Sequence, residues 1–170
     1  MTDIDLKFTA SKIKALVMDV DGVLTDGSLT FDDNGVEYKT FSAKDGQGIV
    51  MLNKSGYITA IISARASKVV QYRADMLGIT KVYLNKKNKL ETFKEFLEEY
   101  KLDSSEIAYI GDDLPDIEIL KIAGLSACPS DAVDEVKQCA KFISSKRGGK
   151  GAVRELCDLI YYSKKQEAGL

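Results

Sequence analysis

The sequence contains no histidine, which excludes two large groups of catalytic and metal-binding sites. Ser-His-Asp and Cys-His mechanisms need an imidazole as general base, and His-ligated metal centres need it as a ligand. The three cysteines, Cys128, Cys139 and Cys157, are odd in number and lack metal-ligand spacing, so we expect reduced thiols. Acid–base chemistry in this chain therefore falls to carboxylates, lysines, tyrosines or cysteines.

The sequence also lacks a strong net charge, a long apolar run and an internal repeat. Its 24 Lys and Arg residues against 26 Asp and Glu residues leave a formal charge of -2, which gives no strong attraction to nucleic acid or an anionic membrane. No stretch approaches the ~20 apolar residues of a membrane span, and residues 1–10 lack the apolar region of a signal peptide. We therefore expect a cytoplasmic protein that forms one domain over residues 1–170.

Short apolar runs alternate with helical patterns along the chain. The expected strands lie at residues 13–20, 57–63, 81–85, 107–112 and 125–128. The expected helices lie near residues 46–55, 66–77, 88–101, 115–123, 131–139 and 151–164. This alternation predicts βαβ units with right-handed crossovers, hence an α/β fold in which helices cover both faces of a central parallel sheet, a three-layer, Rossmann-like sandwich.

One segment breaks the alternation. Residues 28–41, SLTFDDNGVEYKTF, contain two stretches of period-2 alternation around DDNG, which predicts a β-hairpin directly after the first strand. A lone two-stranded hairpin is only marginally stable in water. We therefore expect this hairpin to pack against something else.

Two of the predicted strands end in pairs of carboxylates. Asp19 and Asp21 follow ALVM, and Asp112 and Asp113 follow IAYIG. Ligands of open parallel sheets bind beyond the carboxyl ends of the strands. Carboxylates clustered there repel one another unless a cation neutralises them, and Mg²⁺ prefers such oxygen ligands. The sequence therefore predicts a magnesium site at this edge of the sheet.

A calcium-binding loop or a local turn would also account for acids in these positions, but less well. DVDG could open a calcium-binding loop, yet Val23, Leu24 and Thr30 stand where that pattern needs an acid, a glycine and a glutamate. Either acidic pair alone could be a helix cap or a turn. Two pairs at the ends of two strands of one sheet favour the metal site.

Two further residues fit a phosphate site. Ser63 ends a predicted strand, where its hydroxyl and the following backbone N–H groups can hold phosphate oxygens. Lys89 begins a predicted helix and can bring a positive charge to the same oxygens. Taken singly, Ser63 would be a helix N-cap and Lys89 a solvated lysine. Together with the acids they form a set suited to phosphoryl transfer.

Four segments, DVDGVLTDG, IISAR, KNKLETF and GDDLPD, resemble the four motifs of the haloacid dehalogenase-like phosphatases, in the family's order and at family-like spacing. The likeness runs from about residue 13 to 155. DGVLTDG, KDGQGI and RGGKGAVRE carry a narrower likeness, to those family members that act on 3-deoxy-D-manno-octulosonate 8-phosphate in lipopolysaccharide precursor biosynthesis. One departure is Ala64, where the family commonly has glycine.

The resemblance implies a mechanism and a cofactor. Asp19 would attack phosphorus to form an aspartyl-phosphate, and Asp21 would protonate the leaving oxygen and then activate water. Mg²⁺ would be held by Asp19, the backbone carbonyl of Asp21, and Asp112, with Asp113 and Asp116 in support. The acid at Asp21 argues against halide chemistry, because the dehalogenases of this superfamily lack it. Ser63 and Lys89 would position and neutralise the phosphoryl group.

The same resemblance implies a capless enzyme, because the segments after the first two strands hold the hairpin and no further insertion. A neighbouring subunit of a homotetramer would then cover the active site, with the hairpin at the tetramer's core. The residues implied in substrate binding are Asp21, Ser42, Ala43, Lys44, Asp45, Gly46, Arg65, Arg73 and Lys89.

Two basic segments have a structural alternative. Arg73 lies on the apolar stripe of its helix, where an arginine either extends past the core to solvent or pairs with a carboxylate, such as that of a sugar acid. Arg147 and Lys150 belong to the glycine-rich loop 144–151, before the final helix and tail. They could close over a neighbour's anionic substrate or be solvated charges of a flexible linker.

Three alternative functions stay open. A phosphatase for a nine-carbon, sialic-acid-like sugar 9-phosphate would share all four motifs. A phosphate-accepting signalling module also uses an acidic pair on a parallel sheet, but its acceptor Asp ends the middle strand, where this chain has Ser63. A catalytically inactive scaffold would not need every motif residue, and all of them are present.

Overall fold

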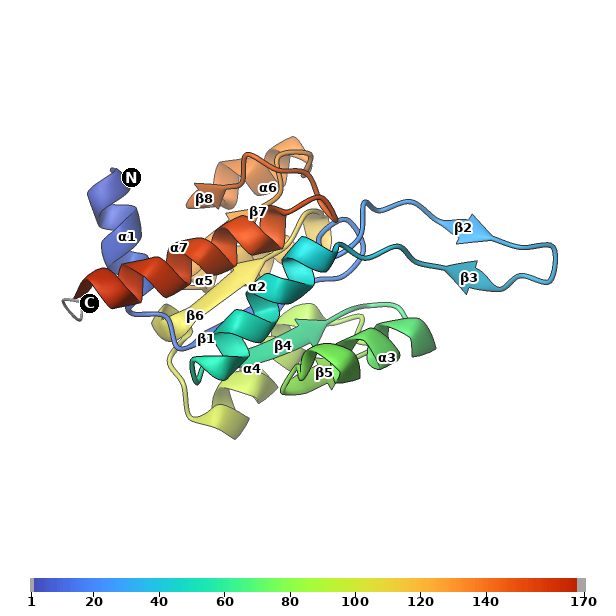
Figure 1. Cartoon of the computed structure of the whole chain (residues 1–170), viewed down its shortest axis with the longest axis horizontal. Coiled ribbons are helices and arrows are strands. Elements are labelled where there is room, and N and C mark those ends of the chain that lie inside the picture. Colours follow the sequence, from blue (N-terminus) through green and yellow to red (C-terminus); the bar gives the residue numbers. More distant parts are fainter. Residues whose placement is uncertain (1, 168–170) are drawn as a thin grey trace.

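A parallel sheet forms the centre of the computed structural model, which describes residues 2–167 (Figure 1). Within that range the sheet has six strands in the order β5-β4-β1-β6-β7-β8, and every neighbouring pair is parallel. The strands are β1 (Ala15–Met18), β4 (Ile58–Ile62), β5 (Lys81–Tyr83), β6 (Ile107–Ile110), β7 (Leu125–Cys128) and β8 (Phe142–Ile143). The chain starts in the middle, winds to one edge and returns to the other, so the strand order reverses between β1 and β6. This reversal is where open α/β sheets bind ligands.

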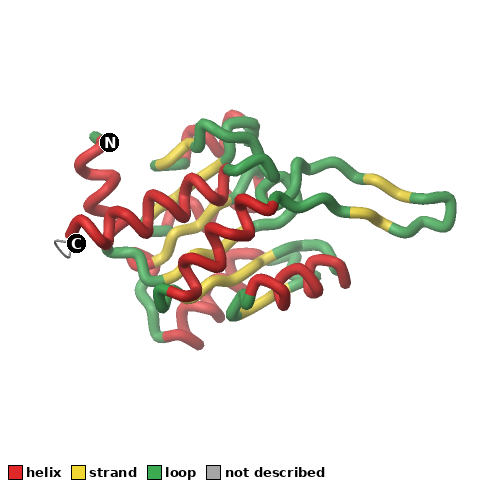
Figure 2. The backbone as a smooth tube through the Cα atoms, viewed as in Figure 1, coloured by secondary structure: helices red, strands yellow, loops and turns green. Residues whose placement is uncertain are grey.

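Helices cover both faces of the sheet (Figure 2). One face carries α1 (Asp3–Ser11), α2 (Ala43–Lys54), α3 (Lys68–Leu77) and α7 (Ala152–Glu167). The other face carries α4 (Lys89–Tyr100), α5 (Ile117–Ile122) and α6 (Asp134–Cys139), with the 3₁₀ turns η1 (Ser104–Glu106) and η2 (Leu114–Asp116). None of the helices among residues 2–167 is long and apolar enough to cross a membrane.

The central strand β1 is apolar at every position because both of its faces are buried. In β1, Leu16 and Met18 pack under one helical layer, and Ala15 and Val17 pack under the other. Such two-sided burial removes the alternation of polar and apolar residues that a half-exposed strand shows. The predicted three-layer α/β sandwich is confirmed, and no cap domain lies in the part of the chain that the structure describes.

The differences from the predicted elements lie at the margins. The first strand covers residues 15–18 instead of 13–20, because the chain turns at both ends of the buried run. Helix α1 was not predicted; it has a weak apolar stripe, and a capping box between Thr2 and Asp5 defines its start. Strand β8 was also missed, since two residues are too short to show a period.

The predicted hairpin is present and projects away from the sheet (Figure 1). Its strands are β2 (Thr30–Phe31) and β3 (Glu37–Tyr38), so the ladder is much shorter than the segment 28–41. The Asp32 carboxylate accepts hydrogen bonds from the N–H groups of Asn34 and Val36, both at 2.9 Å, and Gly35 has a φ of 76°. These local bonds fix the turn.

Helix α7 is anchored by a carboxylate from another helix. It begins after Gly151, which has a φ of 110° and no side chain that could cap the helix. The buried Asp45 of α2 accepts hydrogen bonds from the N–H groups of Gly151 at 3.1 Å and Arg154 at 2.7 Å. Gly48 lets the two helices approach, since a Cβ there would lie 3.0 Å from Cys157 Cβ.

We expect Asp45→Ala to lower the free energy of unfolding by about 1–3 kcal/mol, because two buried N–H groups lose their acceptor. Urea denaturation checks this. The control is Asp158→Ala, which removes a partly exposed pair with Arg154 and should cost less than about 1 kcal/mol. Equal losses in the two variants would contradict the cap.

Candidate active site

Polar side chains gather at the carboxyl ends of β1, β4 and β6 around a pocket of about 170 Å³. All four motifs named above reach it. The lining residues are Asp19, Asp21, Ser63, Ala64, Arg65, Lys89, Asp112, Asp113 and Pro115. The sequence therefore brings its predicted nucleophile, acid, hydroxyl, lysine and metal-binding carboxylate to one place.

Lys89 lies between two carboxylates. It is buried at the first position of α4, which Asn88 caps, and its Nζ lies 2.9 Å from Asp19 Oδ2 and 2.8 Å from Asp116 Oδ1. Burial opposes the charge of the ammonium, but the two carboxylates outweigh burial and raise the pKa of Lys89. It is thus a buried cation at neutral pH and not the solvated lysine of the simpler interpretation.

Asp116 uses both of its oxygens within the protein. Oδ1 accepts from Lys89 and from the Tyr109 hydroxyl at 2.6 Å, and Oδ2 accepts from the N–H groups of Asp112 at 3.1 Å and Asp113 at 3.3 Å. Gly111 is required beside it, because a Cβ there would lie 2.4 Å from Asp116 Cγ. Asp116 therefore holds the lysine and the β6 loop in place.

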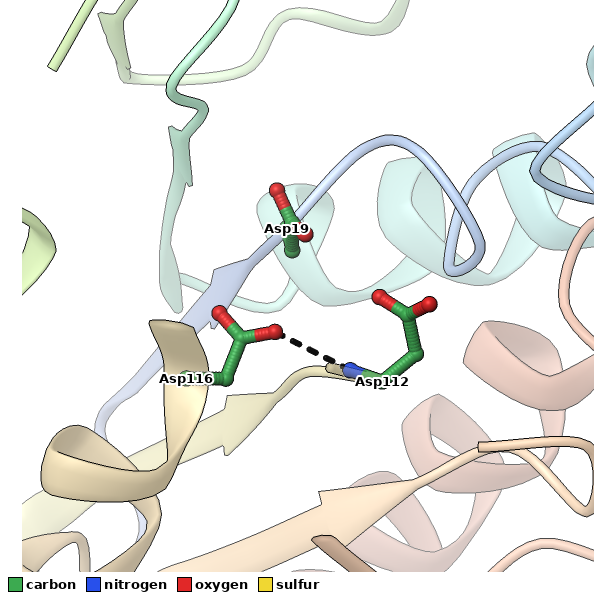
Figure 3. A group of neighbouring side chains, drawn as sticks. All are labelled: Asp19, Asp112 and Asp116. Atoms are coloured by element: carbon green, nitrogen blue, oxygen red, sulfur yellow. Dashed lines mark hydrogen bonds between the residues drawn. The ribbon is translucent and has the colours of Figure 1, made fainter. Parts of the chain in front are cut away.

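The carboxylates of Asp19 and Asp112 have too few positively charged neighbours to balance their negative charge. One carboxylate oxygen from each of Asp19, Asp112 and Asp116 lies within 4.8 Å of the other two, and Figure 3 shows the three side chains together. Burial, and then the charge of Asp116, raise the pKa of Asp19 to about 7. Burial, and then the charges of Asp19 and Asp116, raise the pKa of Asp112 to about 8. Asp112 Oδ1 is buried and has no hydrogen-bond partner among the described residues.

This arrangement fits a hard divalent cation. Both oxygens of Asp116 already accept hydrogen bonds, so the carboxylate oxygens left for a cation are the Asp19 oxygen that is not paired with Lys89 and the orphaned Asp112 Oδ1. Gly22, which has no Cβ, lets the Asp112 carboxylate lie close against the turn after β1. It has a φ of 85°, and a Cβ there would lie 2.0 Å from Asp112 Oδ2.

Ser63 is buried just beyond β4. Its N–H donates to the Tyr83 carbonyl at 2.9 Å, and its Oγ accepts from the Arg65 N–H at 3.3 Å. It is not the N-cap of the next helix, since α3 begins after Ser67. Ser63 therefore lines the pocket from the end of β4, and its contact with a phosphate stays a prediction.

Asp21 is held by residues of the hairpin that sequence reasoning missed. Lys39 Nζ forms an ion pair with Asp21 Oδ1, and Arg65 Nε lies 3.7 Å from Asp21 Oδ2. Glu37 joins the two cations, with Oε1 at 2.5 Å from Arg65 Nη2 and 3.5 Å from Lys39 Nζ. The period-2 pattern of VEYKT, which places Glu37 and Lys39 on one face, was the available signal.

Several predicted substrate-binding residues gather instead at the start of α2, outside the lining of this pocket. Ser42 caps α2 by accepting from the Asp45 N–H, and Arg73 Nη2 donates to the Ser42 carbonyl at 3.4 Å. A Cβ on Gly46 would lie 2.4 Å from that Nη2, so glycine makes room for the guanidinium. The other members are the exposed Ala43 and Lys44. The carboxylate of Asp45 is already bound to α7, and the substrate contacts of this group stay a prediction.

The glycine-rich loop 144–151 is docked on its own chain. Gly149 N–H donates to the Val23 carbonyl at 2.9 Å, and a Cβ on Gly148 would lie 1.8 Å from the Gly22 carbonyl oxygen. Arg147 pairs with Asp131 at 3.1 Å, and Lys150 lies 3.8 Å from Asp26. This packing excludes a flexible linker. The last three residues of the predicted tail, 168–170, lie outside the described residues.

A buried lysine between carboxylates at the switch point of a parallel sheet is the arrangement expected of the haloacid dehalogenase-like hydrolases, whose family profile matches residues 49–156. The chain belongs to this family. It is 40% identical over 156 residues to the 3-deoxy-D-manno-octulosonate 8-phosphate phosphatase KdsC of Escherichia coli (strain B / BL21-DE3). The matched region covers 92% of this chain and 83% of that protein.

Solved structures agree with this membership over nearly the whole chain. A probable YrbI family phosphatase from Pseudomonas syringae superimposes with a TM-score of 0.94 at 43% identity, covering 98% of this chain and 96% of that one. The 3-deoxy-D-manno-octulosonate 8-phosphate phosphatase from Moraxella catarrhalis, solved in complex with a magnesium ion, a phosphate ion and KDO, gives a TM-score of 0.95 at 35% identity, covering 99% and 97%.

The uncompensated negative charge of Asp112 predicts how the free energy of unfolding changes with pH. A folded-state pKa of about 8, raised from 3.8, means that the protein loses stability as pH rises from about 4 through 8. Asp112→Asn removes that loss, so without metal the variant should be more stable than the wild type, by on the order of 1–3 kcal/mol at pH 8 and by less at pH 5. Mg²⁺ should stabilise the wild type but not the variant.

Urea denaturation at both pH values, with Mg²⁺ and with chelator, checks this. Asp113→Asn is the matched control, because Asp113 is more exposed and an amide oxygen can still accept the Leu114 N–H. Equal stabilisation of wild type and Asp112→Asn by Mg²⁺ would remove Asp112 from the metal site.

Proposed function

We propose that this protein is a Mg²⁺-dependent phosphatase that hydrolyses 3-deoxy-D-manno-octulosonate 8-phosphate to 3-deoxy-D-manno-octulosonate and phosphate, in lipopolysaccharide precursor biosynthesis. The observation that carries the proposal is the buried ammonium of Lys89 against Asp19, beside the unpartnered Asp112 Oδ1. A site with one cation and a place for a second suits a dianionic phosphate monoester. The similar phosphatases support 3-deoxy-D-manno-octulosonate 8-phosphate as the particular phosphate monoester.

Asp19 is the nucleophile of this mechanism. Its carboxylate oxygen forms a bond to phosphorus while the bond from phosphorus to the sugar oxygen breaks, and an aspartyl-phosphate results. Asp21 gives its proton to the departing sugar oxygen. It then takes a proton from the water that attacks phosphorus and releases Asp19. The two acids lie two residues apart on the turn after β1, so both face the same pocket.

Lys89 and Ser63 hold the phosphoryl group. Lys89 balances negative charge on its oxygens, and the Ser63 hydroxyl donates to one of them. When bound, Mg²⁺ would neutralise the phosphate, and Asp19, Asp112 and the backbone carbonyl of Asp21 would hold it. Because Asp116 fixes Lys89, the lysine needs little reorganisation when substrate arrives.

Arginines are the proposed partners of the sugar acid's carboxylate. Arg65 lines the pocket, and a guanidinium pairs with a planar carboxylate through two parallel hydrogen bonds. Arg73 and residues 42–46 complete the proposed substrate surface. The near-complete overlap with relatives supports one family domain over residues 1–170, and a cytoplasmic location is part of the same proposal.

A homotetramer is also part of the proposal. The hairpin exposes four large apolar side chains, each more than half accessible: Leu29, Phe31, Val36 and Tyr38. Exposed apolar surface of this kind marks an interaction site. Packing between hairpins of neighbouring subunits would supply the support that an isolated hairpin lacks, and Arg147 and Lys150 would then face a neighbour's substrate.

The first experiment measures phosphate release from 3-deoxy-D-manno-octulosonate 8-phosphate beside hexose, pentose and nine-carbon sugar phosphates. We expect preference for the eight-carbon substrate, loss of activity with chelator, and a fall in kcat of about 10³-fold or more in Asp19→Asn. Activity that prefers a nine-carbon phosphate would overturn the substrate but keep the chemistry. A single labelling by acetyl phosphate without turnover would indicate a signalling module.

Sedimentation tests the tetramer. Phe31→Asp places a charge on the hairpin's apolar surface and should shift the protein to a smaller species, because a desolvated carboxylate opposes association. Ile4→Asp is the control, since Ile4 is exposed on α1, away from the hairpin. A wild-type protein that sediments as a monomer would contradict the proposal.

A further inference from the structure

The side chain of Lys39 is buried although the residue belongs to a largely exposed hairpin. Only 1% of its side chain is accessible, whereas its neighbours Tyr38 and Thr40 are exposed. Its Nζ contacts Asp21 Oδ1 and lies 3.5 Å from Glu37 Oε1. An ammonium buried away from water is costly unless it is paired. The hairpin therefore sets this lysine against one particular carboxylate.

The carboxylate that Lys39 contacts needs a fixed orientation. Asp21 stands on a turn beyond β1 and is 23% exposed, so the sheet alone does not restrain its side chain. Proton transfer to a leaving oxygen requires heavy atoms about 2.6–3.2 Å apart. Lys39 on Oδ1 and Arg65 near Oδ2 contact both oxygens of the group, and Glu37 ties these two cations together.

We infer that Lys39 is the positioning residue for the general acid of the reaction. It acts through Asp21 and not on the phosphoryl group, whose own lysine, Lys89, contacts Asp19 and Asp116 instead. The inference rests on the proposed phosphatase function. It gives the hairpin a role in the chemistry within one chain, separate from its proposed role between subunits.

The consequence is a dependence on the leaving group. A sugar alkoxide leaves poorly and needs a proton from Asp21, whereas p-nitrophenolate leaves well without one. A residue that only stabilises the fold would affect both substrates equally. Because Asp21 also activates the water that releases Asp19 from either ester, a residue that aims Asp21 lowers kcat on both esters but more on the sugar phosphate, and it lowers kcat more than it changes KM.

Lys39→Met is therefore assayed with 3-deoxy-D-manno-octulosonate 8-phosphate and with p-nitrophenyl phosphate. We expect kcat to fall about 10–100-fold on the sugar phosphate and at least about fivefold less than that on the aryl phosphate, which loses only the activation of water. Lys39→Arg, which keeps a cation beside Asp21, should recover most of the loss. Lys81→Met is the matched control. It removes a lysine at the start of β5 that pairs with Glu99 of α4, and since neither residue lines the pocket it should leave both rates unchanged.

If Lys39→Met does not fold, Glu37→Gln provides the same test, because it weakens the restraint on both cations and should reduce the same kcat selectively. Equal losses on the two substrates, or a change confined to KM, would overturn the inference. Failure of the proposed function looks different. In that case the wild-type protein itself releases no phosphate from either ester.

Discussion

The structure of the site depends on the ion pairs of Lys89. This ammonium joins Asp19 after β1 to Asp116 in η2, and Asp116 in turn holds Tyr109 and the backbone after β6. Removing one partner of such a buried group typically costs about 3–5 kcal/mol, because the other charge is left without compensation. One lysine on α4 thus sets the spacing of the two strand ends that form the pocket.

The pairs of Lys89 still leave the pocket with excess negative charge. The site is buried, and burial raises the pKa values of Asp19 and Asp112. One oxygen of Asp112 is also left without a hydrogen-bond partner among the described residues. A protein selected for stability alone would not gather these groups. The deficit has a function when a cation binds, because the cation relieves the repulsion that folding imposes and can then attract a phosphate to the same site.

The hairpin shows how one short strand serves two surfaces. Because side chains alternate in a strand, Val36 and Tyr38 are exposed while Lys39 contacts Asp21 and Glu37 contacts Arg65. The outer face carries the apolar surface of the proposed subunit contact. The inner face contacts Asp21, so the hairpin that projects away from the sheet in Figure 1 is also tied to the pocket.

The sequence by itself determined the α/β class, the hairpin and the identity of the pocket residues. Strands buried on both faces must be apolar, and acids directly after such strands must meet at one edge of a parallel sheet. The tertiary structure alone decided that Lys39 reaches Asp21, that Tyr109 binds Asp116, and that Asp45 caps α7. Most of these contacts join distant parts of the chain. Tyr109 and Asp116 are only seven residues apart, but in the sequence Tyr109 is indistinguishable from any other core residue of a strand. The spacing of apolar residues along the chain does not indicate such contacts, because packing brings the groups together only after the helices and strands have formed.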